Sequence, residues 1–481
     1  MHVYERWYID QRSAVSGAGK PRRSVGLMLL NLSAWIRRQP WLKEVYRHFP
    51  QPLRNKVSET LASRASTQIR FQRTPNWEHR ARLAISPSVE TGNRKFGAAA
   101  GVNVFAYARG QSGLGESARL YVRALLAEGY PVAVHNIDID IPHGMDDTSL
   151  DEHIGTDTPH GINLVFVNPD YLDDAIANIG RERLAGRYTM ACWFWELEKF
   201  PEEWLPALQV VDEIMVSSSF IGEVIRPVTD KPILHVPLPV DEIDDSGLTR
   251  ADFGLEDDVF IFLNSFDFNS FLTRKNPFAV IEAFRRAFAD GQADVRLLIK
   301  SSNGHRHPDK LRELLNAAAG DRRILVRDEV IDRSDVQALQ RCADAYVSLH
   351  RAEGFGLGLA ECMRLGKPVI ATAWSGNMEF MTPENSCLVN YRLVPVGDGD
   401  YLHHVGQRWA EPDIDHAARY MRQLADDREF AARIGAQAAF DIRDKLSPHT
   451  AAERIIHRLG ALSLLPGASD VAGTGSATGT T

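Results

Sequence analysis

The hydrophobic pattern changes at Val102, where short apolar runs begin to alternate with amphipathic segments of helix length. Such alternation is typical of parallel strands whose two faces are both covered by helices. The pattern predicts two series of six strands. The first lies near 102–107, 132–136, 163–167, 188–194, 213–216 and 233–236, and the second near 259–265, 295–300, 323–326, 345–349, 368–371 and 386–389. The expected fold class is therefore α/β, with two doubly wound, Rossmann-like halves.

The segment between the two series predicts a domain boundary. Residues 235–241 contain Pro237 and Pro239, which stiffen an extended connection and remove two backbone donors. We expect a hinge here, between a first domain at 101–240 and a second at 241–463. Amphipathic stretches at the end of the second domain predict helices at 414–426, 428–445 and 448–462. Residues 464–481 are rich in Gly, Ser, Thr and Ala, and we expect a disordered tail.

The first hundred residues differ from the rest in charge. They hold 18 Lys and Arg against 6 Asp and Glu, a net charge of +12, which leaves −20 for residues 101–481. The stretch 27–49 is amphipathic, although Pro40 would kink a helix there. Residues 1–100 are thus either a basic segment that contacts an anionic membrane surface or a partner, or an extension of uncertain order. Nucleic acid is not expected as a partner.

Composition places the chain among ordinary globular proteins. Of its 481 residues, 44% are hydrophobic and 25% are charged, which excludes fibrous and wholly disordered classes. The longest apolar run, 25–36, is well short of the roughly 20 residues that a membrane span needs, and no cleavage site for a secretion signal follows it. The four cysteines show no zinc or redox spacing. These features favour a reducing, cytoplasmic location, peripheral at the inner face of the membrane if residues 1–100 bind lipid.

The most informative motif is a glycine-rich loop that follows an apolar strand. Residues 347–361 are Val-Ser-Leu-His-Arg-Ala-Glu-Gly-Phe-Gly-Leu-Gly-Leu-Ala-Glu. Where such a loop opens a helix, free backbone amides and the helix dipole favour an anion, most naturally a phosphate. Glu353 and Glu361 flank the loop, and carboxylates are suited to accept hydrogen bonds from the paired hydroxyls of a sugar. The alternative is a structural turn with two solvated glutamates.

This segment resembles the E-x7-E signature of the retaining glycosyltransferases of the GT-B fold, family 4. Glu353 and Glu361 stand at its two ends, and Gly366-Lys-Pro-Val-Ile-Ala371 and Gly376-Asn-Met-Glu379 follow at the spacing of that family. The resemblance implies two facing Rossmann-like domains with a cleft between them, and C-terminal helices that return to the first domain. It also implies a nucleotide-sugar donor held by the second domain. Glu361 would bind the ribose, Glu353 the sugar, and Gly354, Phe355, Gly356 and Leu357 the diphosphate.

A basic pair, Arg274 and Lys275, precedes the helix predicted from Phe278 onward. Cations are unfavourable at the start of a helix, which suggests an anion between them. In the family a Lys at this place neutralises the leaving diphosphate together with an upstream Arg, and that Arg is replaced here by Asn269. The resemblance thus assigns catalytic roles to Lys275, Arg274 and Glu353. The alternative is an ordinary exposed basic pair.

A second glycine-rich turn follows the first predicted strand, with Gly110, Gly113 and Gly115. It permits a ligand to approach the backbone closely in front of a helix. The turn alone would also suit a nicotinamide dinucleotide, but the G-x-G-x-x-G order is absent. The resemblance implies that Gly113 and Gly115 face the donor phosphate and the acceptor.

An acidic pair, Asp138 and Asp140, raises the question of a divalent metal. Two carboxylates without clustered His or Cys are a weak basis for such a site. We favour a solvated acidic loop and expect no metal, because Arg274 and Lys275 would supply the positive charge.

Two other features of the first domain concern the acceptor and the donor sugar. Trp193, Trp195 and Trp204 either stack on a sugar or lipid-linked acceptor or pack in the core. Many members of the family place a His close to the donor sugar, and this chain has Asn168 at the expected position.

Taken together, the resemblance implies a retaining glycosyltransferase that moves a sugar from a nucleotide sugar to a glycan or lipid-linked acceptor. A role in cell-envelope or exopolysaccharide biosynthesis is expected, with no cofactor beyond the donor substrate. Closure of the domains about 237–240 would exclude water from the donor. Two other classes stay open: an NAD-dependent oxidoreductase built on the loop at Gly113, and a non-catalytic scaffold of the same GT-B fold.

Overall fold

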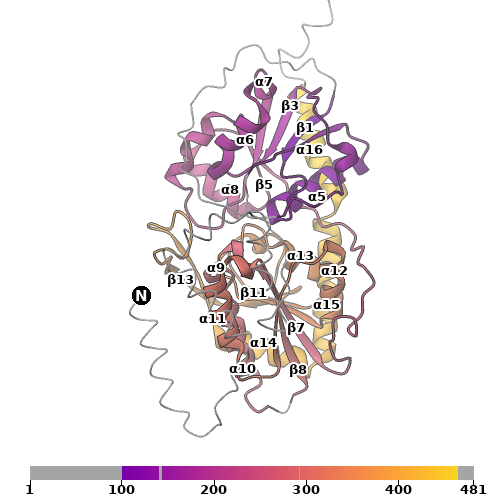
Figure 1. Ribbon diagram of the computed structural model, residues 1–481, viewed down its shortest axis with the longest axis vertical. Coiled ribbons are helices and arrows are strands. Elements are labelled where there is room, and N and C mark those ends of the chain that lie inside the picture. Colours follow the sequence, from indigo (N-terminus) through magenta and orange to yellow (C-terminus); the bar gives the residue numbers. More distant parts are fainter. Residues whose placement is uncertain (1–99, 140–143, 292, 464–481) are drawn as a thin grey trace, which may run out of the picture.

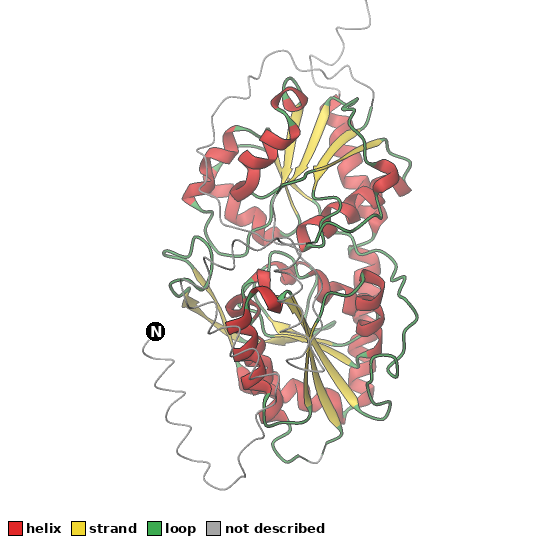
Figure 2. Cartoon of the chain, in the orientation of Figure 1, coloured by secondary structure: helices red, strands yellow, loops and turns green. Residues whose placement is uncertain are grey.

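The computed structural model describes residues 100–139, 144–291 and 293–463. The basic extension predicted at 1–100 lies outside these residues apart from Ala100, and so do Asp140 and the tail predicted at 464–481. Two parallel sheets with helices on both faces are stacked along the long axis of the molecule (Figures 1 and 2). None of the described helices is long and apolar enough to cross a membrane.

The first sheet has six parallel strands in the order β2-β1-β3-β4-β5-β6. They are β1 (Val102–Ala106), β2 (Val132–Asn136), β3 (Ile162–Phe166), β4 (Tyr188–Cys192), β5 (Glu213–Val216) and β6 (Ile233–His235). Its α-helices are α5 (Gly113–Ala127), α6 (Leu172–Ile179), α7 (Arg181–Leu184) and α8 (Ser219–Ile225).

The second sheet also has six parallel strands, in the order β12-β11-β10-β7-β8-β9. They are β7 (Phe260–Asp267), β8 (Val295–Ser302), β9 (Ile324–Asp328), β10 (Ala345–Ser348), β11 (Val369–Thr372) and β12 (Cys387–Val389). Its helices are α9 (Leu272–Lys275), α10 (Pro277–Ala287), α11 (Pro308–Ala318), α12 (Arg333–Cys342), α13 (Leu357–Arg364) and α14 (Ile414–Asp426). All twelve strands in the two sheets begin and end within two residues of the predicted ranges.

The packing of β7 explains why these strands are continuous apolar runs. Phe262 packs on the face that carries α10, where its ring centroid lies 6.3 Å from that of Phe284. Its neighbours Ile261 and Leu263 point to the opposite face, in the hydrophobic cluster that contains Leu359 of α13. Because both faces are buried, successive residues are all apolar instead of alternating with polar ones.

An antiparallel hairpin, β13 (Tyr391–Pro395) and β14 (Arg408–Pro412), was not predicted from the sequence. The side-chain amide of Gln407 accepts a hydrogen bond from the backbone of Lys199 at 3.0 Å and donates one to its carbonyl at 2.8 Å. The hairpin of the second domain therefore reaches the loop that follows β4 in the first domain. Most side chains of β13 are at least partly exposed, so this strand has no continuous apolar run to mark it.

The C-terminal helices α15 (Arg428–Lys445) and α16 (Pro448–Ser463) cover both domains. α15 packs on α13, and α16 packs on α5, where Figure 1 shows it in yellow beside the upper sheet. Arg458 of α16 forms a 2.6 Å ion pair with Glu213, whose side chain is only 1% exposed. The chain thus returns to the first domain after completing the second.

The connection between the domains is itself packed. Val236, Leu238 and Val240 are buried in the cluster that also holds residues of α15 and α16. The backbone amide of Val240 donates to the carbonyl of Leu446 at 2.8 Å, and the Tyr121 hydroxyl donates to the carbonyl of Val236 at 2.6 Å. These contacts hold the predicted hinge segment against both domains.

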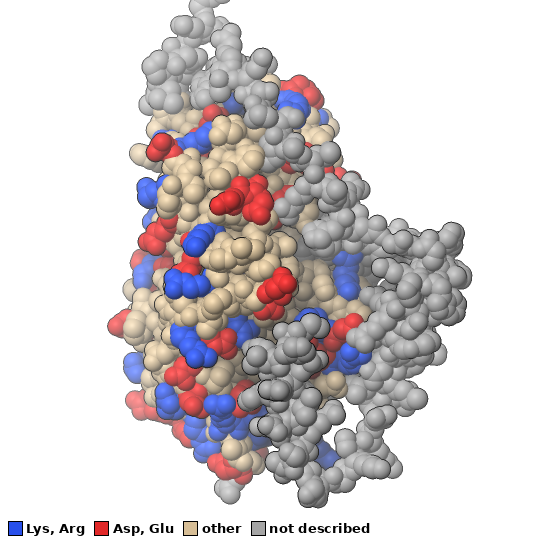
Figure 3. All heavy atoms as spheres, turned by 90° about the vertical axis from the view of Figure 1, so that its left-hand side faces the viewer, with Lys and Arg blue, Asp and Glu red and all other residues tan. Residues whose placement is uncertain are grey.

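The described surface carries charges of both signs. On the face in Figure 3, blue and red side chains are interspersed among neutral ones. The excess negative charge of residues 101–481 is therefore not gathered into one patch on that face.

Candidate active site at the domain interface

The glycine-rich loop between β10 and α13 has a backbone that only glycine accommodates easily. Gly356 has φ +95°, and a Cβ there would lie 2.7 Å from the side chain of Leu359. A Cβ on Gly376 would lie 2.0 Å from the carbonyl oxygen of Gly354, so the loop and the segment after β11 touch backbone to backbone. Within the described part of the chain, the amides of Phe355, Gly356 and Leu357 donate no hydrogen bond. Three free donors therefore lie together at the start of α13.

Glu353 is surrounded by the two predicted cations. Its Oε1 lies 2.5 Å from Nζ of Lys275, and its Oε2 lies 3.2 Å from Nη1 of Arg274. Burial would raise the pKa of Glu353, but Lys275 and Arg274 hold it at about 2. Burial lowers the pKa of Lys275, and Glu353 opposes that shift. The three side chains form a buried ionic cluster in which each charge depends on the others.

Arg274 does more than pair with Glu353. Its guanidinium donates to the carbonyl of Ala352 at 2.7 Å, lies 3.9 Å from Glu196 of the first domain, and faces the ring of Tyr401. Only 4% of the residue is exposed. The alternative of an ordinary surface pair is therefore wrong for Arg274, while the side chain of Lys275 stays 20% exposed.

Glu361 is also buried, so the alternative of two solvated glutamates is wrong. Arg333 contacts both of its carboxylate oxygens, and Gln340 donates to Oε2 from Nε2 at 3.0 Å. Both partners belong to α12. Sequence reasoning missed them because they lie in a polar stretch that resembles an ordinary exposed helix.

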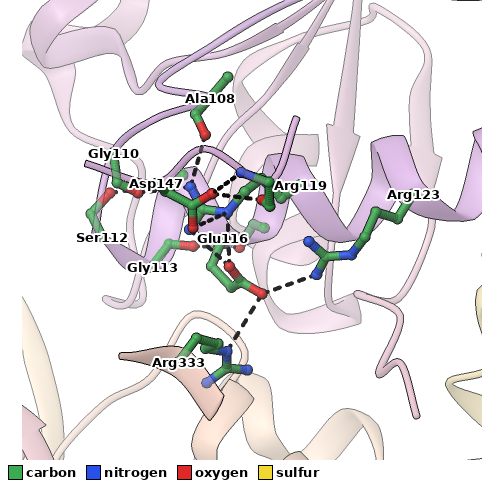
Figure 4. Close-up of polar contacts among 12 residues, drawn as sticks. Ala108, Gly110, Ser112, Gly113, Glu116, Arg119, Arg123, Asp147 and Arg333 are labelled. Atoms are coloured by element: carbon green, nitrogen blue, oxygen red, sulfur yellow. Dashed lines mark hydrogen bonds and ion pairs between the residues drawn. The ribbon is translucent and has the colours of Figure 1, made fainter. Parts of the chain in front are cut away.

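The loop in front of α5 supplies the first-domain side of the site (Figure 4). The hydroxyl of Ser112 caps the helix by accepting from the amide of Gly115 at 3.2 Å. A Cβ at Gly115 would lie 2.4 Å from the carbonyl oxygen of Gly110, whereas one at Gly113 would meet no atom within 4 Å. Gly115 is thus needed for close packing within the loop, and the side of the backbone at Gly113 is open to an approaching group.

Two arginines of α5 hold this loop and the first turn of the helix. Arg119 donates from Nη1 to the carbonyls of Ala108 and Gly110, both at 2.9 Å. It also forms a 2.8 Å ion pair with Glu116, whose other oxygen lies 3.2 Å from Arg123 and 3.6 Å from Arg333. Arg333 contacts Glu116 of the first domain (Figure 4). It also contacts Glu361 of the second domain, so it stands between the two carboxylates.

The loop and α8 meet directly across the interface. The Ser218 hydroxyl donates to the carbonyl of Gly354 at 2.8 Å. The backbone amide and hydroxyl of Ser219 donate to Glu379 at 2.7 and 2.8 Å, and His235 lies 3.1 Å from the same carboxylate. Glu379, part of the motif that follows the E-x7-E segment, thus contacts the first domain.

The remaining residues singled out from the sequence of the first domain make structural contacts. Trp193, Trp195 and Trp204 are at most 2% exposed, so they pack in the core and do not offer a stacking surface to an acceptor. Asn168 exchanges two hydrogen bonds with the backbone of Phe194, at 2.9 and 3.0 Å. The amide of Asn168 therefore links the segments that follow β3 and β4.

The acidic pair is only partly within the described residues. The backbone of Asp138 exchanges hydrogen bonds with the side chain of Asn178, at 3.2 and 3.0 Å. Among the described residues, no three His, Cys, Asp or Glu side chains gather into a metal-binding group.

The match to a known protein family lies in the second domain. Residues 259–410 match the family model described as Glycosyl transferases group 1. This match contains Lys275, Arg274, Glu353 and Glu361. A trehalose synthase of Rubrobacter xylanophilus is 24% identical over 205 residues, which are 42% of this chain and 43% of that protein. The chain therefore matches less than half the length of this curated relative.

Solved structures resemble the whole two-domain arrangement. Anabaena HepE in complex with UDP and glucose superposes with a TM-score of 0.56 at 13% identity, over 76% of this chain and 100% of that one. Sucrose-phosphate synthase from Thermosynechococcus elongatus superposes with a TM-score of 0.52 at 15% identity, over 76% and 99% of the two chains. With two six-stranded parallel sheets and interleaved helices, the chain has the α/β GT-B fold, and its second domain matches the model of Glycosyl transferases group 1.

Proposed function

We propose that the chain is a glycosyltransferase that moves a sugar from a nucleotide-sugar donor to an acceptor with retention of anomeric configuration. The observation that carries the proposal is the buried cluster of Glu353, Lys275 and Arg274 beside three free loop amides. The GT-B fold and the match of residues 259–410 support it.

In this proposal the main chemical task is to stabilise the departing diphosphate, where negative charge develops in the transition state. The amides of Phe355, Gly356 and Leu357 donate to one side of the diphosphate. Lys275, the more exposed of the two cations, exchanges Glu353 for a phosphate oxygen. Arg274 keeps the carboxylate of Glu353 in place, and Glu353 then accepts hydrogen bonds from the sugar hydroxyls. Glu361 binds the ribose, and no metal ion is needed because the cations and amides neutralise the leaving group.

The acceptor proposed is a glycan or a lipid-linked glycan of the cell envelope or of an exopolysaccharide. Contact with an anionic membrane through residues 1–100 belongs to the same proposal. The interface between the loop at Gly113 and the glycine-rich loop is where the donor would meet the acceptor, since both loops follow the carboxyl ends of parallel strands.

An NAD-dependent oxidoreductase is less well supported. The glycines of the turn before α5 run Gly110, Gly113 and Gly115 and lack the G-x-G-x-x-G order of a dinucleotide-binding loop. A non-catalytic scaffold is also disfavoured, because Lys275, Glu353 and Glu361 are all retained.

The proposal is tested by incubating the full chain with UDP-, GDP- and ADP-sugars and a panel of lipid-linked and soluble glycans. We expect release of a free nucleoside diphosphate from one donor, and a product whose anomeric proton signal shows the configuration of the donor. Inverted product would contradict retention alone. Binding of NADH without nucleotide release would favour the oxidoreductase, and absence of any binding or turnover would favour the scaffold.

A further inference from the structure

The carboxylate assigned to ribose already has side-chain partners within the chain. Arg333 contacts Oε1 of Glu361 through Nη2 and Oε2 through Nη1, the latter at 3.2 Å, and Gln340 donates to Oε2 at 3.0 Å. A carboxylate offers about four lone-pair positions. Among the described residues two hydrogen bonds reach Oε2 and none reaches Oε1, but Nη2 of Arg333 stands directly against Oε1, where the hydroxyls of a ribose would have to bind. A ribose can bind Glu361 through both hydroxyls only if one of these partners leaves.

Arg333 is the partner that is free to move. Gln340 is only 2% exposed and lies in the last part of α12. Arg333 is the first residue of α12, and its side chain is 36% exposed. Its Nε already lies 3.6 Å from Oε1 of Glu116, across the domain interface (Figure 4).

Glu116 is arranged to receive this cation. Arg119 occupies Oε2 from Nε and Nη2, at 2.9 and 2.8 Å, whereas Oε1 has longer contacts, at 3.2 Å with Arg123 and 3.6 Å with Arg333. Arg123 also forms a shorter ion pair, at 2.8 Å, with Asp241. Burial would raise the pKa of Glu116, but Arg333, Arg119 and Arg123 keep it below its ordinary value. The carboxylate is therefore ionised at neutral pH, and Oε1 is the oxygen with the longer cation contacts.

We propose that Arg333 is a ribose-sensing residue, which covers Glu361 in the free chain and moves fully onto Glu116 when a ribonucleotide binds. This inference rests on the proposed function, in which Glu361 binds the ribose. The ion pair gained with Glu116 offsets only part of the one lost with Glu361, because Glu116 already binds Arg119 and Arg123. After the exchange, Arg333 links α12 of the second domain to α5 of the first, and binding of the diol strengthens the contact between the domains.

The test compares nucleotides with and without the diol. Isothermal titration calorimetry of the full chain with UDP, GDP and ADP identifies the tightest ligand, which is then compared with its 2′,3′-dideoxy analogue. Arg333→Ala removes the competing cation, so we expect the Kd for the ribonucleotide to fall about two- to fivefold, the effect of one ion pair. The Kd for the dideoxy analogue should not change.

A second variant examines the receiving carboxylate. Glu116→Gln keeps the shape of the side chain but removes its charge, so we expect the Kd for the ribonucleotide to rise about two- to fivefold. In the double variant with Arg333→Ala this rise should disappear, because no cation is left to be received. Should Glu116→Gln fail to fold, the single Arg333→Ala variant still decides the matter through the comparison of the two nucleotides.

Arg341→Ala is the matched control, because it removes another arginine of α12 whose partner is Asp245, at 2.6 Å. Its Kd for the ribonucleotide should equal that of the unchanged chain. Weaker binding of the ribonucleotide by Arg333→Ala, or an equal effect on both nucleotides, overturns the inference and leaves the proposed function standing. Failure of the unchanged chain to bind any of the three nucleotides overturns both.

Discussion

Ser218 donates a hydrogen bond from its hydroxyl to the carbonyl oxygen of Gly354, 2.8 Å away. The donor caps α8 in the first domain, and the acceptor belongs to the glycine-rich loop of the second. Ser218 is fully buried. The position of the loop that carries the free amides therefore depends on the first domain as well as on its own.

Ser218→Ala should destabilise the chain by about 1–3 kcal/mol, because a buried carbonyl loses its donor and α8 loses its cap. Urea denaturation measures this loss. Ser246→Ala, at an exposed position, is the control and should change the unfolding free energy by less than about 0.5 kcal/mol. Equal losses in the two variants would show that the contact across the interface contributes nothing.

Lys275→Ala should lower kcat at least about 100-fold while changing donor affinity far less, because in the proposed mechanism its charge acts mainly on the diphosphate as it leaves. Steady-state kinetics with the active donor measure both quantities. Lys310→Ala is the control, since that lysine is 54% exposed and forms an ion pair with Glu313 of its own helix. A Lys275→Ala variant with unchanged kcat would remove Lys275 from the mechanism.

Comparison of the unchanged chain with Asp328→Asn should show a stability that depends on the titration of Asp328 between about pH 4 and pH 7. Burial raises the pKa of Asp328 to about 7, although Ser301 and Gly304 donate hydrogen bonds to it. Between its ordinary pKa of 3.8 and about 7 the folded chain keeps a proton that the unfolded chain releases, so rising pH destabilises the fold through this group. Relative to Asp328→Asn, the unchanged chain should lose about 2–4 kcal/mol across that window.

Urea unfolding of both chains at pH 5, 6, 7 and 8 follows this difference, with the exposed Asp257→Asn as control. A difference between the unchanged chain and Asp328→Asn that stays constant with pH would contradict the assignment.

Arg458→Ala should destabilise the chain by about 2–4 kcal/mol, because it leaves the buried carboxylate of Glu213 without its cation. The hydroxyl of Tyr188, 2.8 Å from the same carboxylate, cannot replace that charge. Thermal and urea unfolding measure the loss. Arg454→Ala removes an exposed arginine from the same helix and should have little effect. Similar losses in both variants would mean that removing any arginine weakens α16.

The secondary structure was largely predictable because its signal is local. Buried parallel strands are continuous apolar runs, and β2 and β5 have the same bounds as predicted. The hairpin at 391–412 was not predicted because β13 is largely exposed and has no apolar pattern. Its position depends on contacts between Gln407 and Lys199, which lie far apart in the sequence.

The candidate site was predictable only in part. Glu353 and Glu361 were found through the spacing of carboxylates around a glycine-rich loop, which a sequence displays directly. Arg333 and Gln340 could not be predicted in this way, because the polar residues around them are typical of any exposed helix. The burial of Trp195, which lies against Trp204 at a centroid distance of 4.8 Å, also depends on segments that only folding brings together.

The sequence by itself determined which segments become strands and which residues carry the chemistry proposed to bind phosphate and sugar hydroxyls, because apolar periodicity and side-chain chemistry belong to the chain locally. Only the tertiary structure decided which charges meet. It buried Glu353 between Lys275 and Arg274, and it set Arg333 between carboxylates of two domains. The strength of an ion pair depends on distance and on exclusion of water, and both are properties of packing between segments far apart in the chain.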